Sequence, residues 1–423
     1  MRKHLLVFLL LFLVYSLAIS WYLFRVDTSI PETLVGTAAD PQTFMTAEQL
    51  TLSQEFATFR NLIYFINIPL EWLIYLVVLI LGLSQRFRTW SGDVTRYSIV
   101  HTAIYVTLLS LITWALTFPL KWYNYQLAKE YQVSTQLFSD WFREELISFW
   151  VGVILLTIMV VVIYQLMKVS KKRWWFYTWL LSIPFTLVMM YMQPVVIDPL
   201  YNDFYPIQDQ QLEQQILQLA ADADIAADRV YEVNMSEKTN ALNAYVTGIG
   251  DHLRIVLWDT TLEVMSEEAV LFVMAHEIGH FVLNHLPLLV VGSIVLSFFG
   301  LYLGYRLLNW SVKRFGERLG ITTPSDIATV PILLLIFSLL SFAVSPFSNL
   351  VSREYEYQAD SYAIEMTGDP EAAIDAFQQL TIAGLSDVSP PTLVKWFRYT
   401  HPPMIERISQ FDQTAIEDIH LKD

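Results

Sequence analysis

The stretch Ser266-Glu-Glu-Ala-Val-Leu-Phe-Val-Met-Ala-His-Glu-Ile-Gly-His280 is the most informative part of this chain. Ser266 is a residue type that caps helix N-termini, and the two glutamates after it suit the positive end of a helix dipole. Apolar residues follow with helical spacing, so His276 and His280 lie one turn apart on one face. Two such imidazoles can bind one Zn²⁺, and Glu277 lies beside them to act on a water molecule.

The composition around this stretch is that of a membrane protein. Of 423 residues, 54% are hydrophobic and only 16% are charged, which is too apolar for an ordinary soluble protein. A helix needs about 20 apolar residues to cross a bilayer. Seven runs reach this length: residues 5–24, 62–83, 97–120, 146–167, 174–196, 286–308 and 328–347. We therefore expect a mainly α-helical, multi-pass protein in a lipid bilayer.

Charge and cysteine content exclude other classes. The net charge of −15, with no basic patch and no glycine-rich phosphate loop, argues against binding of nucleic acid or nucleotide. The chain has no cysteine, so a thiolate metal ligand and a cysteine nucleophile are both excluded. Histidines and carboxylates must supply any metal site.

The spans divide the chain into four parts. Residues 1–196 form a membrane region of five helices, and 197–284 form the first part of a soluble zinc domain. Residues 285–347 contain two more spans, and 348–423 complete the zinc domain. In 197–284 we expect a helix at 209–223 and three strands at 229–235, 243–247 and 254–258. The turn signal at 248–251 predicts a hairpin from the last two strands, in a small antiparallel sheet before the helix that carries His276.

A third metal ligand is predicted beyond the last span. Zinc enzymes use three protein ligands and keep one position open. Glu356 is the candidate, and Asp360, four residues later on the same face, can accept a hydrogen bond from the outer nitrogen of a liganding imidazole. Glu354 competes for the role but lies on another face. Two spans separate His280 from Glu356, so the chain leaves one membrane face and returns to it, which allows both residues to meet.

Other polar residues are weaker candidates. His401, in Tyr399-Thr-His-Pro-Pro403, and Arg407 can steady the negative charge that develops on a substrate carbonyl. Asn67 and Glu71 lie in the middle of the second span, where a carboxylate normally faces protein or a water-filled cavity. They form either a polar chamber wall or a structural hydrogen bond.

The chain resembles the CAAX prenyl protease type I membrane zinc metallopeptidases, which are gluzincin-type enzymes, over nearly its whole length. The resemblance is carried by His276-Glu-Ile-Gly-His280, Ser352-Arg353, Glu356-Tyr-Gln-Ala-Asp360, His401-Pro and Asn243-Ala-Tyr245, with five spans before the catalytic segment and two between the zinc ligands. It implies seven helices around a large intramembrane chamber, capped by a small α+β zinc peptidase domain.

The resemblance also implies roles. His276, His280 and Glu356 would bind one Zn²⁺ per chain, with Glu277 as general base and Asp360 behind the ligands. Asn243, Ala244 and Tyr245 would bind substrate backbone, and His401 and Arg407 would support the transition state. Asn67 and Glu71 would face the chamber.

The function predicted is hydrolysis of peptide bonds, in extended peptides or membrane proteins, through a zinc-activated water and Glu277. An extended substrate would pair with the edge of the strand at 243–247. Two alternatives remain: an intramembrane-cleaving protease, and a catalytically silent membrane scaffold or receptor.

The loop charges predict an orientation. Lys and Arg in short loops concentrate on the cytoplasmic side. The connectors on one face carry thirteen of these residues, and the short loops on the other carry five. In the cell membrane of a bacterium, this bias places the N-terminus in the cytoplasm and the zinc domain outside. The resemblance implies the opposite, a zinc domain in the cytosol.

Overall fold

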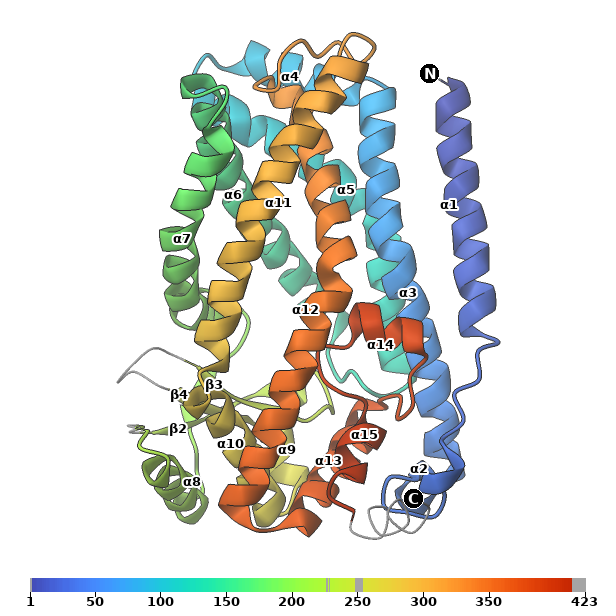
Figure 1. Ribbon diagram of the computed structural model, residues 1–423, viewed down its shortest axis with the longest axis vertical. Helices are drawn as coiled ribbons and strands as arrows, with labels where there is room; N and C mark the ends of the chain where they lie inside the picture. Colours follow the sequence, from blue (N-terminus) through green and yellow to red (C-terminus); the bar gives the residue numbers. More distant parts are fainter. Residues whose placement is uncertain (1, 226, 228, 248–253, 413–423) are drawn as a thin grey trace.

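The computed structural model describes residues 2–225, 227, 229–247 and 254–412. Seven helices in this part of the chain are long and apolar enough to cross a membrane. They are α1 (Arg2–Leu23), α3 (Ala47–Ile80), α5 (Ser98–Glu130), α6 (Phe138–Val169), α7 (Trp174–Met192), α11 (His285–Phe315) and α12 (Val330–Thr367). In Figure 1 they run along the long axis of the molecule. The expected seven-helix membrane protein is confirmed.

The two ends of this bundle differ. Only α4 (Leu83–Val94) and loops cover one end, whereas most of the other elements gather at the opposite end (Figure 1). The gathered elements include α2 (Pro41–Phe44), α8 (Gln210–Asp222), α9 (Asp259–Val264), α10 (Glu267–Val282), α13 (Pro370–Gly384) and α15 (Met404–Ser409), and α14 (Thr392–Arg398) lies beside α12. Short helical turns of the described chain lie at Glu32–Leu34, Gln193–Ile197, Asp198–Leu200 and Met235–Glu237, and a further one, Ile327–Thr329, precedes α12 and contacts α4 at the other end.

The small sheet has four strands in the order β1-β2-β4-β3: β1 (Phe204–Pro206), β2 (Val230–Val233), β4 (Arg254–Trp258) and β3 (Ala244–Thr247). β3 and β4 pair antiparallel, as predicted for the hairpin, although its turn at 248–251 lies outside the described residues. The prediction of a wholly antiparallel sheet was wrong, because β2 and β4 are parallel. The chain between them is long enough to cross back and place β3 at the sheet edge.

Two membrane helices continue into the peripheral region. α12 is a single helix of 38 residues that carries both the last span and Glu356. α3 begins at Ala47, well before its predicted span, because Thr46 and Gln49 form a capping box at its N-terminus. The sequence prediction ended each span where hydrophobicity fell, but a helix persists until a cap or a strained residue stops it. α12 stops at Gly368, which has φ +66°.

The apolar core of the peripheral region surrounds α10. Phe272, Met274 and Ile278 are buried there against residues of α13 and α15, such as Phe377 and Ile405. Burial of each such side chain contributes about 1.5–3 kcal/mol. A helix buried in this way holds its two histidines in fixed positions.

Candidate metal centre

The helix that carries the histidines has the predicted N-terminus. Ser266 is its cap, and the serine Oγ accepts a hydrogen bond of 3.2 Å from the backbone N–H of Ala269. α10 packs closely against α12 at Gly279, where an added Cβ would lie 3.0 Å from Cδ1 of Tyr362 and 3.4 Å from Cα of Ala359. The missing side chain therefore lets the histidines of α10 meet the acids of α12.

Three side chains converge at this crossing. His276 Nε2 lies 3.1 Å from His280 Nε2 and 3.3 Å from Glu356 Oε2. His280 Nε2 lies 3.4 Å from Glu356 Oε1. One donor atom from each of the three residues falls within 4.8 Å of the other two. The structure thus brings together the two histidines and the glutamate that were predicted from segments 76 residues apart.

The donor set fits zinc. Two imidazole nitrogens and one carboxylate are ligands that catalytic zinc sites use, with a further position left open. Glu356 Oε2 is buried, and its charged or polar neighbours among the described residues are His276 Nε2 at 3.3 Å and Arg407 Nη2 at 3.8 Å. A buried carboxylate with only these neighbours is well suited to bind a cation. Glu354, the competing candidate, is exposed and accepts a hydrogen bond from Gln358.

Asp360 and Arg407 lie on the outer side of His276. Asp360 is fully buried, and its Oδ1 lies 2.8 Å from His276 Nδ1. Arg407 Nε donates a hydrogen bond of 2.8 Å to Asp360 Oδ2, and its Nη2 contacts Oδ1 as well. The guanidinium also lies over the Phe377 ring, 4.2 Å from the centroid. These contacts fix the orientation of Asp360, and through it the His276 ring.

The surroundings of His276 and Glu277 on α10 shift the pKa values of both side chains. Burial lowers the pKa of His276, but hydrogen bonds to Asp360 and Glu356 outweigh it and raise that pKa to about 9. Zinc binds neutral imidazole, so metal binding must release this proton. Burial raises the pKa of Glu277 above its ordinary value. Its half-buried carboxylate forms no hydrogen bond with the described residues.

His285, which the sequence analysis did not name, also lies beside this centre. Its Nδ1 lies 2.9 Å from Nδ1 of His280, its ring stacks on Tyr355 at 4.4 Å, and its Nε2 lies 3.3 Å from Gln358 Oε1. A straight helix would turn a residue five positions later away from His280. Here α10 ends at Val282, and Asn284 adopts φ +57°, which redirects the chain into α11.

His401 lies at the exposed side of the ligands. Its side chain is 60% exposed, and its Nε2 lies 3.4 Å from Glu356 Oε1. Buried Arg353 holds the segment before it, because Nη1 donates to the carbonyls of Lys395 (2.9 Å) and Tyr399 (2.7 Å). The sequence analysis used Arg353 only as part of a motif. In the structure, the two hydrogen bonds of Arg353 hold the His401 segment against α12.

The predicted substrate strand lies at the sheet edge. Within the described part of the chain, β3 pairs with β4 on one side and has no strand on the other, and it also contacts α10. Asn243, just before the strand, is exposed, and its Oδ1 accepts a hydrogen bond from the N–H of Ala244. Tyr245 is half-buried and pairs with Val256. An edge strand beside the histidine helix offers free backbone groups to a peptide.

Asn67 and Glu71 lie one turn apart on α3, far from the ligands in sequence. Both are half-buried, and Asn67 Nδ2 lies 3.5 Å from Glu71 Oε1. The carboxylate is therefore paired within its own helix. A chamber-facing role for these residues stays a prediction.

Comparison with known proteins agrees with this geometry. A family model described as peptidase family M48 matches residues 206–415, and one described as CAAX prenyl protease N-terminal, five membrane helices, matches residues 21–203. The Bacillus subtilis (strain 168) protein called uncharacterized metalloprotease YhfN is 45% identical over 414 residues, which cover 98% of this chain and 97% of that protein. The CAAX prenyl protease 1 homolog of Arabidopsis thaliana is 28% identical over 91% of this chain and 90% of its own.

A solved structure shares the fold. The crystal structure of Ste24p from S. mikatae matches with a TM-score of 0.79 at 22% identity, and the match covers 96% of this chain and 97% of that one. The resemblance noted in the sequence is confirmed. The chain belongs to peptidase family M48 and is a membrane zinc metalloprotease of the CAAX prenyl protease type.

Proposed function

We propose that the chain hydrolyses peptide bonds in extended, membrane-associated peptides at the centre formed by His276, His280 and Glu356. The observation that carries this proposal is the convergence of the three side chains, which place one donor atom each within 4.8 Å of the other two. Two imidazole nitrogens and one carboxylate this close together match the ligand set of a catalytic zinc site.

The residues around the centre can each take a separate role in the hydrolysis. Zinc bound there would lower the pKa of a water molecule and polarise a substrate carbonyl. Glu277 takes the proton of the attacking water and returns it to the leaving amine. His401, on the exposed side, stabilises the negative charge on the cleaved carbonyl.

Arg407 has a different proposed role from the one inferred from the sequence. Its Nε and Nη2 both contact Asp360, so it acts on the reaction through Asp360 and His276. The Asp360 carboxylate holds the outer nitrogen of His276 and fixes the ring orientation.

The substrate would bind along β3. Asn243, Ala244 and Tyr245 would offer backbone groups and the Asn243 side chain to an extended peptide, which adds as a further strand. Main-chain pairing of this kind accepts many sequences. Asn67 and Glu71 would line the chamber that receives the remainder of a membrane-associated substrate.

The cellular setting is also a proposal. The basic residues concentrate at the α4 end of the bundle, which supports a cytoplasmic N-terminus and a zinc domain outside the cell membrane of a bacterium. The relative from B. subtilis is consistent with a bacterial host.

A cleavage assay tests the proposal. The purified full chain is incubated in detergent with one extended peptide, prepared with and without a farnesyl group on a cysteine near its C-terminus, and products are identified by mass spectrometry. We expect cleavage that a chelator abolishes and added Zn²⁺ restores. The farnesyl arm decides whether the substrate class in the name of the A. thaliana relative extends to this chain.

Two outcomes would contradict the proposal. A zinc-loaded chain that cleaves neither peptide would support the scaffold or receptor alternative. Cleavage only of a substrate with a membrane-spanning helix, and within that helix, would support an intramembrane protease. The position of α10 outside the spans speaks against the latter.

A further inference from the structure

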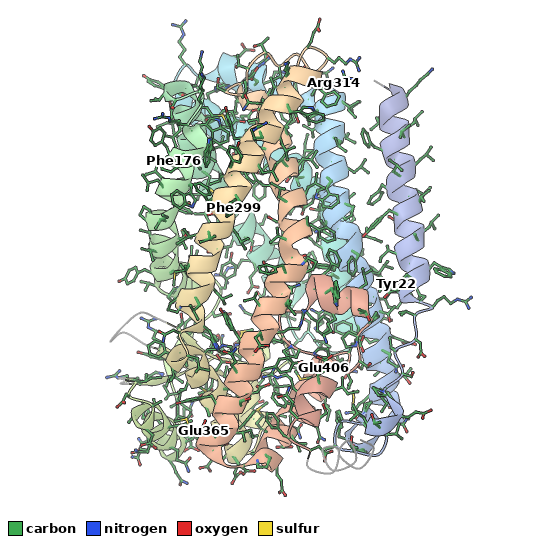
Figure 2. The ribbon with its side chains drawn as sticks, in the orientation of Figure 1. Tyr22, Phe176, Phe299, Arg314, Glu365 and Glu406 are labelled. Atoms are coloured by element: carbon green, nitrogen blue, oxygen red, sulfur yellow. The ribbon has the colours of Figure 1, made fainter. Side chains whose placement is uncertain are left out.

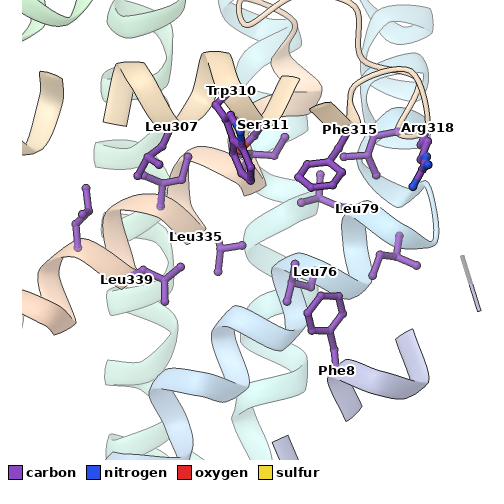
Figure 3. Close-up of a pocket in the computed structure, with 15 residues that line it drawn as sticks. Phe8, Leu76, Leu79, Leu307, Trp310, Ser311, Phe315, Arg318, Leu335 and Leu339 are labelled. Carbon is purple, nitrogen blue, oxygen red and sulfur yellow. The ribbon is translucent and has the colours of Figure 1, made fainter. Parts of the chain in front are cut away.

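A second site lies in the membrane-spanning part, remote from the zinc centre. It is an apolar pocket of about 480 Å³ between α1, α3, α11 and α12. Figure 3 shows Phe8 of α1 facing Leu76 of α3, with Leu335 and Leu339 of α12 on another side. Sixteen residues of α12, or about 24 Å of helix, separate Leu340 at the near side of this pocket from Glu356. Pockets of this size bind small ligands.

The one charged side chain that lines the pocket lies at one end of it. Almost every lining side chain is aliphatic or aromatic, and the exceptions are Ser311 and Arg318. In Figure 3, Arg318 lies beside Phe315 at one extremity, and Leu339 lies at the other. This lining suits a ligand that is mainly hydrocarbon and carries an anionic group at one end.

The charge of Arg318 is available to such a ligand. Arg318 is exposed, and no carboxylate of a described residue lies within ion-pair distance of it. By contrast, Arg88 at the same end of the bundle pairs with Asp326. Glu317 is the adjacent acid, but Lys313 and Arg314 precede it on the same segment, so the local charge stays positive.

The surroundings favour a bilayer lipid. Phe8 lies on α1, whose neighbouring apolar side chains are exposed, and Leu339 of α12 is itself exposed, which in a membrane protein means exposed to lipid. Long basic side chains at helix ends reach toward the headgroup region, where they meet anionic headgroups. An acyl chain below and a headgroup phosphate at Arg318 match the pocket in shape and charge.

We propose that this pocket binds one anionic glycerophospholipid of the surrounding bilayer, with an acyl chain between α1, α3, α11 and α12 and its headgroup phosphate at Arg318. This site is separate from the peptidase centre and does not rest on the function proposed for it. The thermal unfolding temperature in detergent serves as the control for correct folding of each variant.

The test is lipid retention by the full chain in detergent, measured by native mass spectrometry with phosphatidylglycerol and phosphatidylcholine as the probes. We expect one phosphatidylglycerol to be retained more tightly than phosphatidylcholine. Arg318→Gln should weaken phosphatidylglycerol binding about fivefold, which is about 1 kcal/mol for one basic residue at an anionic surface. The matched control is Arg96→Gln, an exposed arginine at the same end that does not line the pocket, and it should leave binding unchanged.

Two pocket-filling variants test the acyl site. Leu335→Trp and Leu339→Trp should each abolish retention of either lipid, because the indole occupies the volume of the chain. In the unmodified protein, a phosphatidylglycerol with a photoreactive diazirine on its acyl chain should cross-link to peptides of α11 or α12. This test does not depend on the folding of a variant.

Several results would overturn the proposal. Equal retention of both lipids, or equal losses in Arg318→Gln and Arg96→Gln, would show that diffuse surface charge is the cause. Full retention in both tryptophan variants, or cross-links confined to other helices, would place the lipid elsewhere. A change in dimerisation rather than lipid content would identify a second copy of the chain as the occupant.

Discussion

At the residue scale, the choice of the third ligand is the most direct consequence of the geometry. Glu356 and Glu354 are two residues apart on α12, but only Glu356 meets His276 and His280. We predict that Glu356→Gln loses bound zinc, while the matched variant Glu354→Gln keeps it. Zinc content by mass spectrometry of the purified chain checks this. Equal zinc content in the two variants would remove Glu356 from the ligand set.

Asp360 should show a milder effect. It touches His276 without reaching the metal position, and substitutions of such supporting groups typically cost about 10–100-fold in metal affinity or activity. Asp360→Asn keeps the shape but loses the charge that faces His276 and Arg407. We predict a loss in that range for zinc affinity, measured by competition with a chromogenic chelator. An unchanged affinity and activity would show that this contact is only structural.

His285 provides a similar test for the other histidine. Its Nδ1 faces Nδ1 of His280, so it fixes the ring of a ligand just as Asp360 does. We predict that His285→Ala lowers zinc affinity about 10–100-fold, in the same chelator assay. Tyr355→Phe is the control, because it keeps the ring that stacks on His285. If both variants bind zinc like the unmodified chain, the His280–His285 contact does not support the metal.

The sequence predicted part of this centre for a clear physical reason. Positions four residues apart on one helix must share a face, so His276 with His280, and Glu356 with Asp360, could be paired from spacing alone. His285 could not, because its position depends on the left-handed backbone of Asn284. The contacts of Arg407 also depend on tertiary packing, since its partner Asp360 lies 47 residues away.

At the element scale, the crossing of α10 and α12 depends on Gly279. A Cβ there would press on Tyr362 and on the backbone of Ala359. Overpacking of this kind costs about 1–3 kcal/mol, whereas the higher helix propensity of alanine returns about 1 kcal/mol. We predict that Gly279→Ala lowers the thermal unfolding temperature in detergent and reduces activity, because the histidines move relative to Glu356.

Gly292 is the matched control for that variant. It lies on α11, and a Cβ there would meet nothing within 4 Å. Gly292→Ala should therefore leave stability and activity unchanged or slightly raise stability. Equal unfolding temperatures for the two variants would show that the α10–α12 contact does not require glycine.

The sequence predicted the membrane spans but not the full lengths of the helices or the pairing of all strands. Hydrophobic runs located all seven spans, because only apolar segments of that length are tolerated across a membrane. The same criterion missed the polar extensions of α3 and α12, where capping and local propensity continue the helix into water. The parallel pairing of β2 with β4 was also missed, since strand order depends on contacts that periodicity does not encode.

At the scale of the whole molecule, the basic α4 end and the zinc end must face opposite sides of the membrane. The chain contains no cysteine, so single cysteines can be introduced at Thr43, near the zinc end, and at Thr89 on α4, both of which are exposed. Intact cells are then treated with a membrane-impermeant maleimide. From the charge bias, we predict labelling at Thr43→Cys and none at Thr89→Cys. The reverse pattern would place the zinc domain in the cytoplasm.

Apolar and acidic side chains are separated along the long axis of the molecule. Figure 2 shows aromatic and aliphatic side chains such as Phe176 and Phe299 along the spans, and acids such as Glu365 and Glu406 in the peripheral region. Polar chemistry is therefore concentrated at one end of a largely apolar molecule. Hydrolysis is proposed to take place at that end, at the residues assigned to it.

The most direct measurement of that claim is a comparison of Glu277→Gln with His276→Ala, in which zinc content and peptide cleavage are determined on the same purified samples. Glu277 supplies the proton transfer and no bond to the metal, whereas His276 is a ligand. We predict that Glu277→Gln retains about one zinc per chain but loses cleavage by about 10²–10⁴-fold, the usual contribution of a general base. His276→Ala should lose both. Loss of zinc from both variants, or substantial cleavage by Glu277→Gln, would contradict the account.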